Sequence, residues 1–175
     1  TNALTRILIT GPESSGKTTL AMQLAEELGG RYWPEYARAW LLAQDGVYTS
    51  TDLDIMLGEQ EMERQFALFQ PYNLPQVFDT GPETFYTWSL IKYGSVSPHI
   101  EARCLSTYYD LCLLLAPDLP WEEDPLRESP DQEERMLIFR TYAGRLHQWG
   151  WRFAIIHGDQ RLDQAMNVIQ AANFK

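Results

Sequence analysis

The sequence predicts an α/β fold: a five-stranded parallel sheet with helices on both of its faces. Short apolar runs alternate with longer amphipathic stretches along the 175 residues, which is the order expected of strand–helix–strand units. The strand-like runs are apolar at nearly every position rather than at every second one, as in strands that are covered on both faces. A glycine-rich segment connects the first strand to the first helix.

Each element follows from a local pattern. Strands are expected at five short apolar runs, and helices at seven longer stretches in which apolar residues recur at helical spacing. The strands are residues 6–10, 30–33, 76–79, 110–115 and 152–157. The helices are residues 17–28, 34–43, 51–69, 82–93, 100–108, 130–149 and 159–171. Neither an internal repeat nor a Gly/Ser linker interrupts this order, so residues 1–175 are expected to form a single domain.

The charge of the chain argues against a nucleic-acid partner. Lysine and arginine number 14 against 24 aspartates and glutamates, which gives a net charge of −10. A surface of this sign repels a phosphate backbone, so a bound anion needs a local group of basic residues. The expected partner is a small molecule, and the sequence leaves the oligomeric state open.

No segment is expected to lie in a membrane. The longest apolar runs, such as residues 111–116, fall far short of the roughly 20 residues that span a bilayer. The chain begins almost directly on a strand-like run, and its two cysteines show no spacing typical of a metal site or a disulfide framework. The expected location is therefore the reducing cytoplasm.

The most specific motif is a phosphate-binding loop. Gly11-Pro-Glu-Ser-Ser-Gly-Lys17-Thr18 fits G-x-x-x-x-G-K-[ST] and lies between an expected strand and an expected helix. Glycines let backbone N–H groups approach phosphate oxygens, and the helix adds the positive end of its dipole. Lys17 supplies a cation for the outer phosphates and Thr18 a hydroxyl for Mg²⁺, so the expected cofactors are ATP and Mg²⁺. The expected nucleotide-binding residues of this segment are Gly11, Glu13, Ser14, Ser15, Gly16, Lys17, Thr18 and Thr19.

Glu13 is the unusual member of this loop, because an acid among phosphate-binding amides repels the nucleotide. Its side chain is expected to point towards metal, substrate or arginine side chains instead.

Several classes of protein carry such a loop. A guanine-specifying N-K-x-D segment is absent from the sequence, and the chain has no room for the extra modules of a large mechanical ATPase. A compact small-molecule kinase fits the length.

Two further groups of polar residues follow strands, where the ligands of parallel sheets gather. Asp79 is expected beside the phosphate loop if the third strand neighbours the first, and it would hold Mg²⁺ or accept the proton of a substrate hydroxyl. The alternative is an N-cap role for Asp79 or Thr80 at the helix that begins near Pro82. Glu35 and Arg38 share one face of an opening helix, where they bind an acceptor or simply form an ion pair.

Residues 117–131 contain four prolines and seven charged residues and are expected to form a long, lid-like loop. Structureless loops of this length are uncommon unless they have a function. Trp121 lies in this loop and is expected to contact the ligand when the loop closes. Tyr36 and Trp88 lie near strand ends and are candidates to stack on a base, with packing in the core as the alternative.

Taken together, these residues resemble the ribosylnicotinamide kinase domain of the bacterial bifunctional nicotinamide-nucleotide adenylyltransferase/kinase regulator and its stand-alone relatives. The resemblance runs from residue 7 to about residue 169. It rests on G-P-E-S-S-G-K-T-T-L at 11–20, E-Y-A-R at 35–38, L-G-E-Q at 57–60, V-F-D-T at 77–80 with T-F-Y-T-W at 84–88, and P-W-E-E-D-P-L-R at 120–127. It implies a P-loop NTPase fold of the nucleoside/nucleotide kinase type. The implied reaction transfers the γ-phosphate of ATP to the 5′-hydroxyl of nicotinamide riboside.

The resemblance also implies roles for individual residues. Thr18 and Asp79 would hold the metal, Arg127 would reach the phosphates from the lid, and Arg135 would join it. The implied catalytic residues are Lys17, Glu35, Asp79 and Arg127. The resemblance places Glu35 and Arg38 at the acceptor and gives Asp79 the role of metal ligand or base. With the aromatic candidates named above, the residues expected to contact the acceptor are Glu35, Tyr36, Arg38, Asp79, Trp88 and Trp121.

The sequence departs from this family in two ways. The adenylyltransferase half, with its H-x-G-H-type site, is absent from the 175 residues. Asp79 is followed by Thr-Gly rather than Thr-Asp, which leaves the acceptor open to another nucleoside or a small hydroxyl compound. A regulatory ATPase module that reads nucleotide state is a further alternative, because the same loop would serve it.

Overall fold

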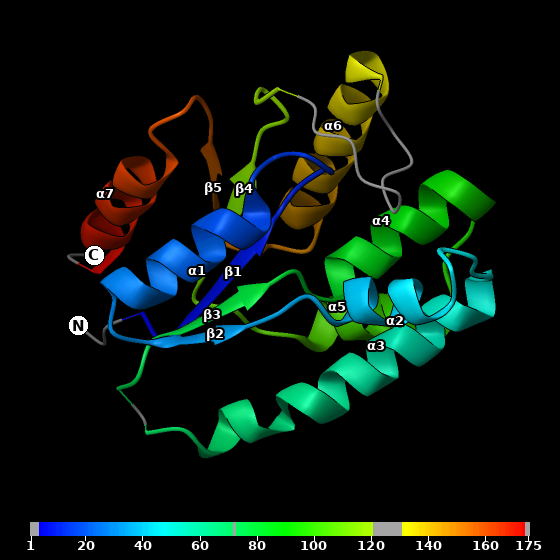
Figure 1. Ribbon diagram of the computed structural model, residues 1–175, viewed down its shortest axis with the longest axis horizontal. Coiled ribbons are helices and arrows are strands. Elements are labelled where there is room, and N and C mark those ends of the chain that lie inside the picture. The colour runs from blue at the N-terminus through cyan, green and yellow to red at the C-terminus, as the bar shows by residue number, and fades with distance from the viewer. Residues whose placement is uncertain (1–3, 72, 121–130, 174–175) are drawn as a thin grey trace.

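Five parallel strands form the central sheet of the computed structural model, which describes residues 4–71, 73–120 and 131–173 (Figure 1). The strands are β1 (Arg6–Thr10), β2 (Arg31–Trp33), β3 (Gln76–Asp79), β4 (Leu111–Leu115) and β5 (Phe153–Ile156). Their order in the sheet is β2-β3-β1-β4-β5, and every neighbouring pair is parallel. The predicted five-stranded parallel sheet is confirmed, and β1 lies at its centre.

The helices lie close to their predicted positions. They are α1 (Lys17–Glu27), α2 (Tyr36–Ala43), α3 (Ser50–Arg64), α4 (Pro82–Tyr93), α5 (Pro98–Ser106), α6 (Gln132–Gln148) and α7 (Arg161–Asn173). α5 begins two residues before its predicted start, because the Ser97 hydroxyl caps it by accepting from the Ile100 N–H at 3.2 Å. Proline 98 fits the first helical position, where no backbone N–H is needed.

The predicted helix 51–69 is in fact two elements. α3 is followed by the 3-10 helix η1 (Gln65–Phe69). Within η1 the carbonyl of Ala67 accepts a hydrogen bond of 3.0 Å from the side-chain amide of Gln76 at the start of β3. This bond occupies a carbonyl that a continuing α-helix would use, and it fastens the end of the helix to the sheet.

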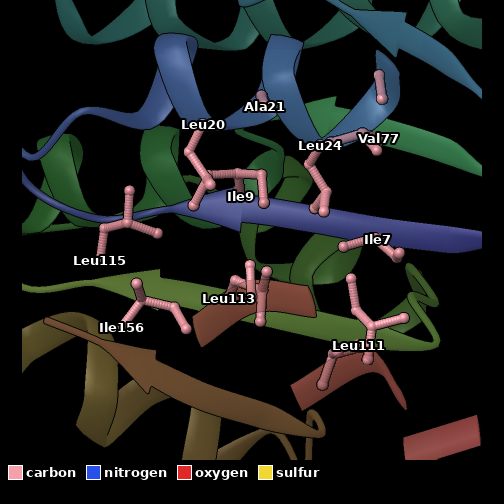
Figure 2. Packing of buried hydrophobic residues seen from close by; sticks show 13 residues of the cluster. Ile7, Ile9, Leu20, Ala21, Leu24, Val77, Leu111, Leu113, Leu115 and Ile156 are labelled. Carbon is pink, nitrogen blue, oxygen red and sulfur yellow. The ribbon is translucent and has the colours of Figure 1, made fainter. Parts of the chain in front are cut away.

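One face of the sheet is covered by α1 and α7 (Figure 1). Ile7 and Ile9 of β1 point to this face and pack with Leu20 and Leu24 of α1, as Figure 2 shows. Leu113 of β4 lies in the same cluster, and all of these side chains are at most 2% exposed. This layer holds α1, and therefore the loop that precedes α1, against the centre of the sheet.

The opposite face takes the alternate residues of the same strands. Leu8 of β1 and Cys112 of β4 pack there with Tyr142 and Leu146 of α6. Both sheet faces are therefore buried, which explains why the strands are apolar at nearly every position. A third cluster joins α2, α3, α4 and α5 beside the sheet (Figure 1), around core residues that include Leu57 of α3.

The two cysteines, Cys104 and Cys112, are free thiols in buried positions. Burial raises the pKa of both thiols. Within residues 4–71, 73–120 and 131–173, each helix is too short or too polar to cross a bilayer. The cytoplasmic location remains a prediction.

Leu113→Ala is expected to destabilise the fold by about 2–5 kcal/mol, because it leaves a cavity between β4 and the α1/α7 layer. The measurement is urea unfolding followed by far-UV circular dichroism. The matched control is Leu137→Ala on α6, whose side chain is 57% exposed and whose loss should change the free energy of unfolding by about 0.5 kcal/mol or less. Equal effects of the two substitutions would contradict the assigned core.

Candidate functional site

The phosphate-binding loop lies between β1 and α1, as predicted. Gly11 has φ 143°, and a Cβ there would lie 2.6 Å from the carbonyl oxygen of Leu115 at the end of β4. Gly16, the N-cap residue of α1, has φ 79°. Both positions therefore need glycine, one for close backbone approach and one for its left-handed conformation.

Hydrogen bonds inside the loop fix its shape. The carbonyl of Pro12 accepts from the Ser15 hydroxyl at 2.6 Å and from the Lys17 ammonium at 2.8 Å. Lys17 thus reaches back over the loop from the first turn of α1, so its charge lies on the inside of the curve. Such a ring of backbone and ammonium donors suits a polyphosphate.

Asp79 lies beside this loop because β3 pairs with β1. The register aligns Ile9 with Asp79, so the condition attached to the predicted role of Asp79 is met. The Asp79 Oδ2 accepts from the Thr18 hydroxyl at 2.7 Å and from the Tyr32 hydroxyl at 3.0 Å. The side chain is fully buried, and its other oxygen, Oδ1, has no hydrogen-bond partner among the residues that the structure describes.

The hydroxyl oxygen of Thr18 and the Oδ1 atom of Asp79 are suitable ligands for a Mg²⁺ ion. Magnesium prefers hard oxygen ligands and usually combines a few protein oxygens with phosphate and water. Among the described residues, no group of three or more His, Cys, Asp or Glu side chains forms an all-protein metal cage. The donor set thus suits a metal that is shared with a nucleotide.

The N-cap alternative for Asp79 and Thr80 is wrong. The N-cap residue of α4 is Gly81, and the helix has no side-chain cap hydrogen bond there. The Gly81 N–H instead donates to the carboxyl of Glu83 at 3.0 Å. Asp79 is therefore turned to Thr18 rather than to the helix that follows it.

Glu35 follows β2 and is the N-cap residue of α2. The pKa of its carboxyl is raised from 4.5 to about 7, first by burial and then by the nearby carboxylate of Asp79, while Lys17, Arg64 and Arg38 act in the opposite direction. A carboxyl with a pKa near neutrality can take up and release a proton at the pH of the cell.

A cavity of about 940 Å³ joins most of the predicted site residues. Its size is that of a site for a drug-sized or nucleotide-sized ligand. The predicted residues that line it are Gly11, Glu13, Ser14, Ser15, Gly16, Lys17, Thr18, Thr19, Glu35, Arg38 and Trp88. Further lining residues include Gln23, Leu41, Thr84, Leu119, Tyr142 and Leu162.

Three predicted residues lie outside this lining. Asp79 sits behind Thr18, to which it is bonded. The Tyr36 hydroxyl donates to the Glu59 carboxylate at 2.5 Å, so it is engaged on α3. Arg135 is buried on α6, where it donates to Gln132 at 2.6 Å. Contacts of Tyr36 and Arg135 with a ligand remain predictions, and so do those of Arg127 and Trp121, which lie outside the described residues together with most of the lid-like loop 117–131.

Sequence reasoning assigned no role to Arg161, which also lines the cavity. Arg161, at the start of α7, donates to the carbonyls of Ile156 at 3.0 Å and Ala116 at 2.9 Å. It also pairs with Asp118 at 2.5 Å, and Asp118 accepts from the Gly158 N–H at 2.7 Å. Arg161 therefore ties the segments after β4 and β5 together beside Gly16, 4.0 Å from where a Cβ of that glycine would lie. Its position shortly after β5, where the ligands of a parallel sheet gather, is the signal that could have found it.

Glu83 was also missed, and it accounts for the departure at residue 81. A Cβ on Gly81 would lie 2.8 Å from the Glu83 carboxyl and 2.6 Å from the Tyr109 hydroxyl. Because residue 81 is a glycine, the carboxyl of Glu83, two residues further along the chain, has room to approach the backbone. This carboxyl is wholly buried and also accepts from the N–H and the hydroxyl of Thr84.

Comparisons with known proteins agree with this architecture. A family model described as an AAA domain matches residues 6–161, and the chain belongs to that family. No curated protein matches the chain. Among solved structures, the NadR protein in complex with NR superposes with a TM-score of 0.77 at 21% identity, over 97% of this chain and 51% of the NadR chain. NadR in complex with NAD and AMP-PNP gives 0.72 at 20% identity, over 97% and 50%.

Two complete kinases have the same fold. Thymidylate kinase from Ehrlichia chaffeensis gives a TM-score of 0.65 at 15% identity, over 98% of this chain and 99% of the kinase. Deoxyadenosine kinase from M. mycoides gives 0.62 at 14% identity, over 94% and 98%. The predicted P-loop fold of the nucleoside/nucleotide kinase type is confirmed, as is the resemblance to the NadR kinase domain at the level of fold. The chain spans about half the length of the NadR chains it matches.

The buried carboxyl of Glu83 is expected to make stability depend on pH. Burial raises its pKa from 4.5 to about 7, so the native state holds a proton that the unfolded chain releases over this range. The stabilisation is therefore complete below pH 4.5 and is lost as the pH rises through about 7. Relative to Glu83→Gln, the wild type should lose on the order of 3 kcal/mol of unfolding free energy.

Urea unfolding at pH 5, 6, 7 and 8 measures this difference, and the raised pKa of Glu35 affects both proteins alike. Glu101→Gln on α5 is the control, because the side chain of Glu101 is exposed. Its curve should run parallel to the wild type, whereas a parallel curve for Glu83→Gln would refute the shift.

Proposed function

We propose that this chain is an ATP-dependent kinase that phosphorylates the 5′-hydroxyl of a nucleoside, with nicotinamide riboside as the acceptor. The observation that carries the proposal is the placement of Glu35 in the wall of the cavity that the phosphate loop also lines. A titratable carboxyl is thereby available beside the position of a bound polyphosphate. The NadR structure with NR and the deoxyadenosine kinase support a nucleoside as the acceptor.

In this proposal the phosphate loop binds and orients the triphosphate. Backbone N–H groups of residues 13–18 and the Lys17 ammonium bind phosphate oxygens, while Thr18 and Asp79 hold Mg²⁺. Bound Mg²⁺ would neutralise charge on the phosphate oxygens. Lys17 releases the carbonyl of Pro12 when it turns to the phosphates, so the loop can relax around them.

Glu35 acts as the general base rather than Asp79. Glu35 lines the cavity, whereas Asp79 is fully buried behind Thr18 and accepts from both Thr18 and Tyr32. Glu35 takes the proton of the acceptor hydroxyl as the oxygen–phosphorus bond forms. The bond from the γ-phosphorus to its bridging oxygen breaks at the same stage, and ADP is the leaving group.

The remaining cavity wall binds the acceptor and excludes water. In the proposal Arg38 supplies a planar cation near the transferred group, and Trp88, Thr84 and Leu41, which also line the cavity, contact the acceptor. Arg127 and Trp121, from the lid-like loop, complete the enclosure in the proposal. Exclusion of water keeps the enzyme from transferring the phosphate to water instead.

A second candidate function is a regulatory ATPase module that reads nucleotide state. The AAA domain family match favours it, because this description does not require an acceptor. The phosphate loop and the Mg²⁺ oxygens would be the same in both cases. The two functions differ only in whether the cavity residues assigned to the acceptor, Glu35, Arg38 and Trp88, bind a substrate.

Wild-type protein is expected to consume ATP in proportion to phosphorylated nucleoside, with nicotinamide riboside the best of a panel that includes adenosine, deoxyadenosine and thymidine. Mass spectrometry of the products measures the transfer. Lys17→Ala should lower kcat/KM about 100-fold or more, because it removes a charge from the phosphates. Nucleoside-independent hydrolysis with no phosphorylated product would refute the kinase and favour the regulatory module.

Glu35→Gln and Asp79→Asn are expected to fail in different ways. Glu35→Gln should lower kcat about 100-fold or more while Mg²⁺–nucleotide binding persists, since only the base is lost. Asp79→Asn should raise the Mg²⁺ concentration needed for half-maximal nucleotide binding. Steady-state kinetics and a Mg²⁺ titration with a fluorescent ATP analogue measure these effects.

Glu61→Gln is the matched control, because Glu61 pairs with Arg103 at a distance of 2.5 Å on the outer side of α3. It should leave both readouts unchanged. The reversed pattern, with metal affinity lost in Glu35→Gln and turnover alone lost in Asp79→Asn, would exchange the two roles.

A further inference from the structure

Arg64 binds the backbone at the ends of β2 and β3, next to the proposed catalytic carboxylates Glu35 and Asp79. Arg64 is the last residue of α3 and does not line the cavity. Its Nη2 donates to the carbonyls of Pro34 and Asp79, each at 2.8 Å, and its Nη1 donates to the carbonyl of Thr80. A single guanidinium therefore bonds the backbone of two separate segments.

These bonds begin where the sheet stops. The ladder between β2 and β3 ends at the pair Trp33 and Phe78, one residue before Pro34 and Asp79. Pro34 has no N–H with which to continue the ladder, and α2 starts only at Tyr36. Arg64 thus provides the cross-link between the two segments at the point where Glu35 and Asp79 leave the sheet.

The segment after β3 requires such support. Thr80 has φ 63°, which is a left-handed conformation that β-branched residues rarely adopt. Its N–H donates to the carbonyl of Ile9 at 2.9 Å, and its carbonyl accepts from Arg64. Glu83 holds the next residue by accepting from the Gly81 N–H. Arg64 and Glu83 therefore hold this turn from both sides, and the turn sets where the Asp79 carboxylate points.

The charge of Arg64 acts on the same carboxylates. Burial lowers the pKa of its guanidinium, whereas Glu83, Asp79 and Glu35 all raise it. Arg64 in turn lowers the pKa of Glu35 and of Glu83. The guanidinium thus offsets part of the repulsion among three neighbouring acids.

We propose that Arg64 is a positioning residue of the phosphoryl transfer, which fixes the backbone of Glu35 relative to that of Asp79 and so holds the base and the metal ligand in register. This inference rests on the proposed function. The planar fork is essential, because Nη1 and Nη2 serve carbonyls of different residues at one time. A lysine carries the same charge but lacks this geometry.

The test compares Arg64→Lys and Arg64→Gln with the wild type, and with Arg103→Lys as the matched control. Arg103 also donates to an acid of α3, Glu61, but on the outer surface, 40% exposed. We expect Arg64→Lys to lower kcat about 10-fold or more and to raise the Mg²⁺ concentration for half-maximal binding of a fluorescent ATP analogue several-fold. The affinity for that analogue in the absence of Mg²⁺ should change by about twofold or less, because Arg64 makes none of the contacts within the phosphate-binding loop that are described above.

Two results would overturn the inference. In one, Arg64→Lys retains kcat and the Mg²⁺ dependence of nucleotide binding within about twofold of the wild type. In the other, metal-free nucleotide affinity falls in parallel with kcat, which indicates a general loss of structure. If Arg64→Gln does not fold, Arg64→Lys alone decides. A wild type that phosphorylates no nucleoside refutes the proposed function, and the Mg²⁺ titration then still tests Arg64 separately.

Discussion

The hydrogen bond of 2.7 Å from Thr18 to Asp79 joins the first turn of α1 to the end of β3, and the rest of the site depends on it. It exists because β1 and β3 are neighbours with Ile9 opposite Asp79, so the phosphate loop and the strand-end carboxylate leave the sheet side by side. The bond turns one oxygen of Asp79 to α1 and leaves Oδ1 without a partner among the described residues. The pairing of two central strands thus brings together the two oxygens that hold Mg²⁺ in the proposed function.

The same arrangement places three acidic side chains, Glu35, Asp79 and Glu83, close together in a largely buried region. Burial and the neighbouring Asp79 raise the pKa of Glu35, and burial raises the pKa of Glu83. Arg64 lowers the pKa of both carboxyls, and Lys17 lowers that of Glu35, but these cations offset the increase only in part. Such a cluster does not stabilise the fold, because desolvation disfavours each charge. The apolar layers on both faces of the sheet, including Ile9 and Leu113, supply the stability that holds these groups in place.

Most of the fold could be predicted from local patterns, because the strands are buried on both faces and the phosphate loop is a contiguous motif. The placement of Asp79 followed from the rule that ligands gather at strand ends, once β3 was taken to neighbour β1. Arg64 could not be found in this way. Its partners are backbone carbonyls of distant segments, and any residue type supplies a carbonyl, so the sequence shows no pattern. The ring of Tyr36 was assigned to the acceptor, but its hydroxyl is bonded to Glu59, a partner that only the packing of α2 on α3 reveals.

The shape of the cavity bears on the choice between a kinase and a nucleotide sensor. A sensor needs a nucleotide site, and the loop with the metal oxygens already meets that need. The cavity of about 940 Å³ extends beyond the loop to Glu35, Arg38 and Trp88, on elements that contribute nothing to the loop itself. In the proposed kinase, the basic side chain, the acid and the aromatic ring would contact a hydroxyl, its phosphorylated product and a flat base. Arg64 bonds the carbonyl of Pro34, next to Glu35, and the carbonyl of Asp79, and so links the backbone beside the proposed base to that of the proposed metal ligand, a link that phosphoryl transfer needs and nucleotide binding alone does not.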